Sequence, residues 1–190
     1  MDLLLLGPQG SGKGTQAKRI AAEHGLPHVS TGEMFRALDD SKPIGREVSH
    51  IMARGELVPD EVTIRMIRDR LADDDAVGGF ILDGFPRNLA QARAPDEMLA
   101  EIGRDLDAIL FFDLPDDVAR ERMRRRAVEE DRPDDTPEAM ERRLTIYHQD
   151  TEPVVEHYRT TGRLVPLHAG RSIEEVAAEI AAALNQVAVR

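Results

Sequence analysis

The chain has 190 residues, of which 41% are hydrophobic and 32% are charged. This composition can build one packed domain and is not that of a disordered segment. The formal net charge of −11 argues against a broad surface for nucleic acids or anionic membranes. No apolar run approaches the roughly 20 residues of a membrane-spanning helix, and there is no cysteine for a disulfide or a thiolate metal site. We therefore expect a single cytoplasmic domain over residues 1–190, without nucleic-acid or membrane partners.

Short apolar segments, each followed by a helical pattern, predict a parallel β-sheet. The expected strands are 2–6, 28–29, 80–83, 108–113 and 164–168. Helical patterns lie near 13–24, 32–38, 44–54, 60–72, 88–100, 116–126, 137–159 and 172–187. Thr136 and Ser172 stand where hydroxyl side chains cap helix starts. Alternating strands and helices predict an α/β fold of three layers, with a five-stranded parallel sheet and helices on both faces. Ligands of such sheets bind outside the carboxyl ends of the strands.

A glycine-rich loop connects the first strand to the first helix. Residues 7–15 read Gly-Pro-Gln-Gly-Ser-Gly-Lys-Gly-Thr, which is the context of a phosphate-binding P-loop. Glycines let backbone N–H groups turn towards an anion, the helix N-terminus adds a positive dipole, and Lys13 adds a mobile charge. The general pattern places a Mg²⁺-binding Ser or Thr directly after the lysine. Here that position is Gly14 and the hydroxyl follows at Thr15, so we expect nucleotide phosphates and water to hold Mg²⁺, with Asp83 as an outer-sphere acceptor.

Four further blocks follow in order along the chain. They are Ser-Thr-Gly-Glu-Met-Phe-Arg at 30–36, Gly-Glu-Leu-Val-Pro-Asp at 55–60, Asp-Gly-Phe-Pro-Arg at 83–87 with Gln91, and a set of arginines after residue 120. Together with the P-loop, their order and spacing resemble the adenylate kinases, in their short-lid form, over nearly the whole length. The resemblance implies a P-loop NTPase-type fold and reversible phosphoryl transfer between ATP and AMP, giving two ADP, in adenine nucleotide homeostasis. It also implies direct in-line transfer with no covalent intermediate, by a monomer.

The resemblance also implies roles for individual residues. The implied ATP-binding residues are Gly10, Ser11, Gly12, Lys13, Gly14, Thr15, Arg122, Arg126 and Arg171. The implied AMP-binding residues are Thr31, Arg36, Met52, Glu56, Val58, Gly84, Arg87, Gln91, Arg132 and Arg143. The implied catalytic residues are Lys13, Arg87, Arg122, Arg132 and Arg143. Asp134 and Asp135 would orient the arginines. The planar guanidinium of arginine suits a phosphate. The Gln91 amide can both donate to and accept from a base. Met52 could equally belong to the hydrophobic core.

Two segments of the expected domain carry special functions by this resemblance. Residues 30–58 would form a helical AMP-binding insert and residues 123–135 a short lid. Only the five residues 127–131 separate Arg126 from Arg132, and 127–135 is polar and interrupted by a proline, which predicts an exposed loop. With no cysteine and a short lid, we expect no structural zinc. The six histidines show no ligand spacing.

Two other functions remain as alternatives. A UMP/CMP kinase would share the loop and the mechanism, and Asn88 is common in that relative, but Thr31 and Gln91 favour adenine. A nucleotide-binding regulator would keep the fold with little turnover. Such a protein would be expected to lose arginines, whereas all six are present here, namely Arg36, Arg87, Arg122, Arg126, Arg132 and Arg143.

Overall fold

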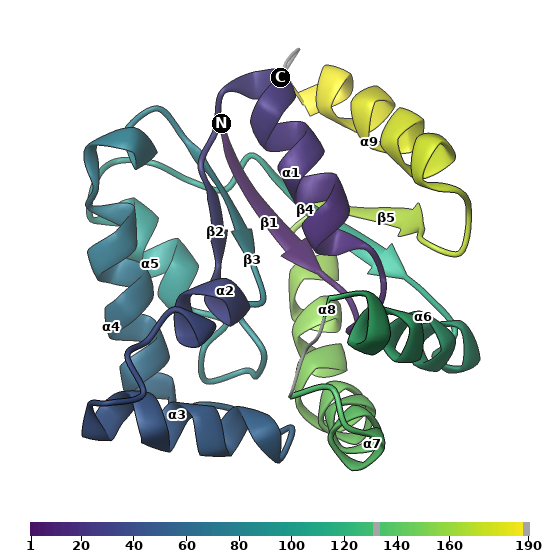
Figure 1. Cartoon of the computed structure of the whole chain (residues 1–190). Helices are drawn as coiled ribbons and strands as arrows, with labels where there is room; N and C mark the ends of the chain where they lie inside the picture. The colour runs from purple at the N-terminus through teal and green to yellow at the C-terminus, as the bar shows by residue number, and fades with distance from the viewer. Residues whose placement is uncertain (131–133, 188–190) are drawn as a thin grey trace.

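A computed structural model describes residues 1–130 and 134–187, and its centre is a five-stranded parallel sheet (Figure 1). The strands are β1 (Asp2–Leu6), β2 (His28–Ser30), β3 (Phe80–Asp83), β4 (Ala108–Asp113) and β5 (Leu164–His168). They lie in the order β2-β3-β1-β4-β5, with every neighbouring pair parallel. The expected sheet is therefore confirmed, and β2 is one residue longer than predicted.

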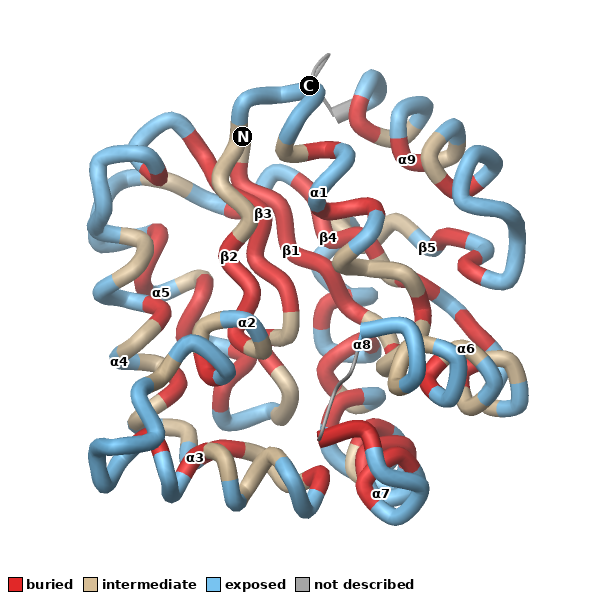
Figure 2. Tube along the Cα trace, in the orientation of Figure 1, coloured by how far each residue is buried: buried red, intermediate tan, exposed pale blue. Residues whose placement is uncertain are grey.

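Side chains of β1 alternate between two hydrophobic cores, one on each face of the sheet. Leu3 and Leu5 pack with the helices of one face, and Leu4 and Leu6 with those of the other, as the two-residue period of a strand requires. The first face is covered by α1 (Lys13–His24), α6 (Asp116–Glu129) and α9 (Ile173–Val187). The second is covered by α4 (Asp60–Leu71), α5 (Ala94–Ala100) and α8 (Glu152–Arg159). Both sides of β1 and β3 are buried (Figure 2), so the three-layer prediction is confirmed.

The remaining helices gather where the strands end. They are α2 (Thr31–Arg36), α3 (Pro43–Ala53) and α7 (Pro137–Ile146), and together with α6 they lie at the lower end of the sheet in Figure 1. A small separate core of Phe35, Val48 and Val58 holds α2 and α3 together. The expected insert thus has its own packing, beside the edge where ligands of parallel sheets bind.

Two expected helices differ in the structure. The pattern at 88–100 gives a helix only from Ala94, because the Asn88 side chain accepts a hydrogen bond from the Gln91 N–H at 2.8 Å and forms a turn instead. The pattern at 137–159 gives α7, a π-helical turn η2 (Tyr147–Thr151) and α8. Pro153 explains the break, since proline has no N–H and its ring clashes with the carbonyl four residues earlier.

The two predicted hydroxyl caps are present. The Thr136 side chain accepts a hydrogen bond from the Ala139 N–H at 3.2 Å. Ser172 and Glu175 exchange side-chain to backbone bonds at 3.0 and 3.2 Å, which is a capping box. A 3₁₀ turn, η1 (Asp74–Ala76), precedes β3.

The segment 127–135, for which we predicted an exposed loop, begins in a helix and ends in two buried residues, Asp134 and Asp135. Helix α6 continues to Glu129, three residues into the expected loop, and Arg132 lies outside the described residues. In the part of the chain that is described, no helix is both long enough and apolar enough to cross a membrane.

Candidate active site

The P-loop is a turn that depends on glycine. Gly7, Gly10 and Gly12 all have positive φ angles, of 142°, 80° and 89°. A side chain at Gly10 would also place its Cβ 2.7 Å from the Ala119 carbonyl oxygen of α6. Gly12 begins α1 in the left-handed region without a side-chain cap, and the first turn contains no acidic residue. The first N–H groups of α1 are therefore left for an external anion.

Lys13 folds back over this loop. Its Nζ donates to the carbonyl oxygens of Gly7 and Pro8, both at 2.8 Å, and to the Ser11 hydroxyl at 3.2 Å. Burial lowers the pKa of Lys13 to about 8; Asp83 opposes this shift, and the positive charges of Arg87 and Arg126 add to it. An anion bound in the loop would relieve this accumulation of positive charge.

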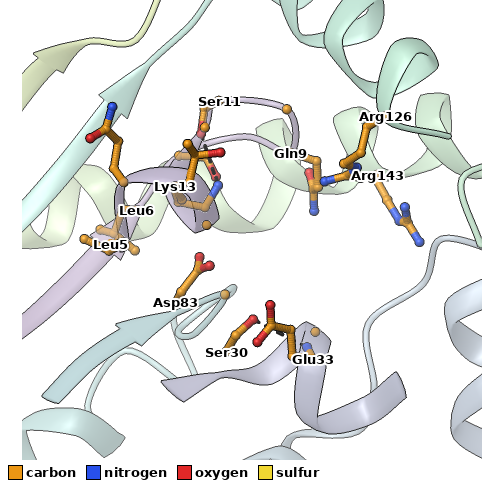
Figure 3. A pocket seen from close by; sticks show the side chains of 18 of the residues that line it. Leu5, Leu6, Gln9, Ser11, Lys13, Ser30, Glu33, Asp83, Arg126 and Arg143 are labelled. Carbon is orange, nitrogen blue, oxygen red and sulfur yellow. Dashed lines mark hydrogen bonds between the residues drawn. The ribbon is translucent and has the colours of Figure 1, made fainter. Parts of the chain in front are cut away.

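Asp83 ends β3 and faces the P-loop. It is 9% exposed and points towards Lys13 in Figure 3, and its Oδ2 lies 3.3 Å from Nε2 of His28. Burial acts to raise the pKa of Asp83, but the His28 hydrogen bond and the Lys13 charge outweigh it, and the pKa is lowered. The carboxylate is therefore ionised at neutral pH, as an acceptor for water around a cation must be.

A second group of cations, Arg87 with Arg36 and Arg143, lines the same cavity. Nε of Arg87 donates to the Gly84 carbonyl oxygen at 2.7 Å, and the Thr31 hydroxyl donates to the same oxygen at 2.9 Å. Burial is the largest of the causes that lower the pKa of Arg87 to about 10; the charges of Arg143 and Arg36 act in the same direction, and Asp83 opposes them. The arrangement again favours an anion in front of Arg87.

Two buried carboxylates join the arginines of three helices. Asp135 accepts hydrogen bonds from Arg126 of α6, the shorter at 2.6 Å, and from Arg143 of α7. Asp134 accepts from Arg143 at 2.7 Å and lies 3.8 Å from Arg36 of α2. Figure 3 shows Arg126 and Arg143 side by side at one end of the cavity. Asp134 and Asp135 thus lie where they could orient these arginines, and that role stays a prediction.

Arg122, four residues before Arg126 on α6, connects this helix to the loop between β5 and α9. Its guanidinium donates to the Ala169 carbonyl oxygen at 2.8 Å and lies 3.5 Å from those of Gly170 and Arg171. Arg171 is exposed and contributes to the same wall. This wall lies next to the P-loop, where we expected ATP.

These groups surround one cavity of about 610 Å³. Its described lining carries nine lysine and arginine side chains against six aspartates and glutamates, although the whole chain has a net charge of −11. The excess of positive charge suits polyphosphate ligands. Of the expected ATP- and AMP-binding residues that the structure describes, Thr31 alone is absent from this lining; its hydroxyl donates to the Gly84 carbonyl oxygen.

The residues present fit a cation held mainly by its nucleotide. A Cβ at Gly14 would lie 3.9 Å from Oδ2 of Asp83, so this carboxylate comes close to the start of α1. Among the described residues, no group of three or more histidine, aspartate or glutamate side chains could hold a metal ion, and the sequence contains no cysteine.

Comparison with known proteins decides the family. Residues 5–163 match the sequence profile of a family described as adenylate kinase. The chain belongs to the adenylate kinase family. It is 46% identical over 189 residues to an adenylate kinase of Parvibaculum lavamentivorans, which covers 97% of this chain and 92% of that protein. It is 44% identical to adenylate kinases of Xanthomonas campestris, over 98% of this chain and 100% of that protein, and of Caulobacter vibrioides, over 99% of each.

Sequence reasoning missed two contacts in this adenylate kinase site. His28, to which we assigned no chemistry, lies beside Asp83, and Asp60 holds the amide of Gln91. Spacing along the chain could not reveal either contact, because the partners are 55 and 31 residues apart. The available signal was that His28 begins a short strand and that Asp60 closes the block 55–60.

Proposed function

We propose that this chain catalyses reversible phosphoryl transfer between ATP and AMP, giving two ADP, and so serves adenine nucleotide homeostasis. Membership of the adenylate kinase family supports this function. The observation that carries it is the pairing of two cationic groups in one cavity, the P-loop with Lys13 and the set around Arg87. They are close enough for Arg87 to depress the pKa of Lys13. Two phosphate groups bound there would face each other, as a donor and an acceptor must.

ATP would bind on the P-loop side of the cavity. Lys13 and the first N–H groups of α1 bind its phosphates, together with Gly10, Ser11, Gly12, Gly14 and Thr15. Arg126 reaches the phosphates from α6. Arg122 and Arg171, on the wall formed with the β5–α9 loop, hold the nucleoside part.

AMP would bind between the insert 30–58 and the segment 84–91 that follows β3. Arg36 and Arg87 clamp its phosphate, for which the planar guanidinium fork is suited. Gln91 contacts the base. The remaining residues that we assign to AMP are Thr31, Met52, Glu56, Val58, Gly84, Arg132 and Arg143. Closure of the lid, 123–135, would bring its arginines over the transferring group and exclude water.

The reaction needs no general base in the protein. The attacking oxygen belongs to the AMP phosphate and is already anionic at neutral pH. Catalysis therefore consists of in-line alignment, to which Arg122 contributes by holding ATP, and of neutralisation of the charge on the transferring group by Lys13, Arg87, Arg132 and Arg143. Direct transfer leaves no covalent intermediate on the protein.

Mg²⁺ would enter with ATP. Bound to the phosphate oxygens, it supplies positive charge to the transferring group. In this chain Asp83 would accept hydrogen bonds from the water around the ion, because Gly14 offers no side-chain ligand. The ionised state of Asp83 that His28 and Lys13 favour supports this role.

Steady-state rates with ATP, Mg²⁺ and each nucleoside monophosphate test the proposal. We expect AMP to be the best acceptor. Faster phosphorylation of UMP or CMP would instead identify a UMP/CMP kinase. Nucleotide binding without turnover of any acceptor would identify a regulator that keeps the fold.

We also propose that the protein acts as a monomer in the cytoplasm. The most exposed large hydrophobic side chains of the described residues are Val77 between η1 and β3, Ile102 after α5 and Val128 of α6. They belong to different elements and do not support a shared apolar interface. Size-exclusion chromatography with light scattering tests this: a mass near 21.1 kDa supports a monomer, and twice that mass contradicts it.

A further inference from the structure

The Gln91 side chain is held by two protein groups on the wall of the cavity. Gln91 is only 2% exposed but contributes to the lining. Its Nε2 donates to Oδ1 of Asp60 at 2.6 Å, and its Oε1 accepts from the backbone N–H of Arg87 at 2.8 Å. Asn88 donates to the same Asp60 oxygen at 3.0 Å. Three polar side chains and a backbone N–H thus form one connected network at the start of α4 and the turn before α5.

The chemistry of the two partners determines which way the amide points. An ionised carboxylate can only accept hydrogen bonds, and a backbone N–H can only donate. The orientation of a glutamine amide is usually inferred from such partners, and here both require the same one. If the amide were reversed, its oxygen would face the Asp60 carboxylate and its NH₂ would face the Arg87 N–H.

Because the amide is held in one orientation, the hydrogen-bonding groups that it leaves for a ligand are also fixed. One N–H of Nε2 and one lone pair of Oε1 are left. The edge of adenine offers the complementary pair, a donor at N6 and an acceptor at N1. A 6-oxopurine offers the reverse, since O6 accepts and N1–H donates. An amide that could rotate by half a turn would match either base, whereas a held amide matches only the 6-aminopurine.

We propose that Asp60 is a positioning residue that fixes the amide of Gln91 and thereby makes the site select 6-aminopurine over 6-oxopurine monophosphates. This inference rests on the proposed function, in which Gln91 contacts the base of AMP. Asp60 itself is not part of the cavity lining and acts through Gln91. Cytosine presents a donor and an acceptor in the same order as adenine, so the held amide of Gln91 does not discriminate against CMP. Selection against CMP would depend on the shape of the pocket.

The test compares AMP with IMP, because the two differ only at the edge that the amide reads. The readout is the ratio of kcat/KM for AMP to that for IMP in the parent, in Asp60→Ala and in Asp60→Asn. Asp60→Ala frees the amide and is expected to lower the ratio by about tenfold or more, since one mismatched polar contact has at least that effect. Asp60→Asn keeps an acceptor oxygen at the same place and is expected to stay within about threefold of the parent.

Glu61→Ala is the matched control. Glu61 is exposed and supplies the other acidic charge in the first turn of α4, so its removal weakens the same helix end without touching Gln91. We expect no change in its ratio. Since a fall in the amount of folded protein lowers both rates alike, the ratio reports base selection and not stability.

Each result decides between this proposal and its rejection. An unchanged ratio in Asp60→Ala would overturn it. An equal loss in Asp60→Asn or in Glu61→Ala would also do so, because the negative charge and not the acceptor would then matter. A parent enzyme that does not phosphorylate AMP contradicts the proposed function itself, whereas a parent that does so, with an unchanged ratio in Asp60→Ala, contradicts only the role of Asp60.

Discussion

Replacing Lys13 by methionine removes the charge from the P-loop while keeping a long, flexible side chain. In the proposed function this variant should lose phosphoryl transfer. It also tests the electrostatics of the loop independently of any substrate. Folding places Lys13 among the carbonyl oxygens of Gly7 and Pro8, but it also buries the charge beside Arg87 and Arg126.

The size of the effect follows from the pKa of Lys13. Burial lowers this pKa from 10.5 to about 8, which corresponds to about 3 kcal/mol of unfavourable free energy for the charged form in the folded state. Below pH 8 the lysine is protonated in both states and the whole cost is present. Between pH 8 and 10.5 the unfolded chain still holds the proton that the folded chain has lost, so stability rises with pH. The parent should therefore gain stability relative to Lys13→Met over this range.

Urea unfolding of both proteins measures this gain. We expect the free energy of unfolding of the parent, minus that of Lys13→Met, to increase by about 2–3 kcal/mol from neutral pH to about pH 10. Other groups that titrate alike in both proteins cancel in the subtraction. Lys18→Met, on the exposed side of the same helix, provides the reference for a solvated lysine. A difference that does not change with pH would refute the argument that folding disfavours the charged form of Lys13.

Three further predictions concern the arginines and metal content. Arg87→Lys keeps the charge but loses the planar fork, so kcat/KM for AMP should fall by about two orders of magnitude, or about 2.7 kcal/mol; activity within threefold of the parent would remove Arg87 from the phosphate. Asp135→Asn leaves the buried Arg143 and the half-buried Arg126 without a full counter-charge and should cost about 3 kcal/mol in urea unfolding, whereas Asp116→Asn, in an exposed pair with His148, should cost less than about 1 kcal/mol. Elemental analysis should find no zinc and chelation should leave the Tm unchanged, because the described residues contain no cluster able to hold the ion; stoichiometric zinc would contradict this.

Local patterns in the sequence were sufficient for the sheet and for the loop. Each strand is a short apolar run next to glycine, proline or a helical pattern, and all five expected strands are present. The P-loop is equally local, since its glycines, its lysine and the following helix are consecutive in the chain. Thr136 and Ser172 cap the helices that they precede. Periodicity and capping act over a few residues, so they can be recognised without knowing the fold.

The lengths of some helices depended on interactions that periodicity does not record. The pattern at 88–100 has helical spacing, but the Asn88 side chain competes for the Gln91 N–H and delays α5 until Ala94. The resemblance to adenylate kinases indicated the correct family and a set of site residues. The individual roles of those residues stay predictions.

The contacts within the site were decided by tertiary structure alone. His28 reaches Asp83 because β2 lies next to β3 in the sheet, although β3 is third in the chain and β1 lies on its other side. Asp60 reaches Gln91 because the start of α4 packs beside the turn that precedes α5. Asp134 faces both Arg36 and Arg143 because α2 and α7 meet at the same end of the sheet. Strand order and helix packing bring these groups together from distant parts of the chain, and burial there shifts the pKa values of Lys13 and Arg87. The sequence indicated which residues to expect in the site, and the packing determined which of them are neighbours.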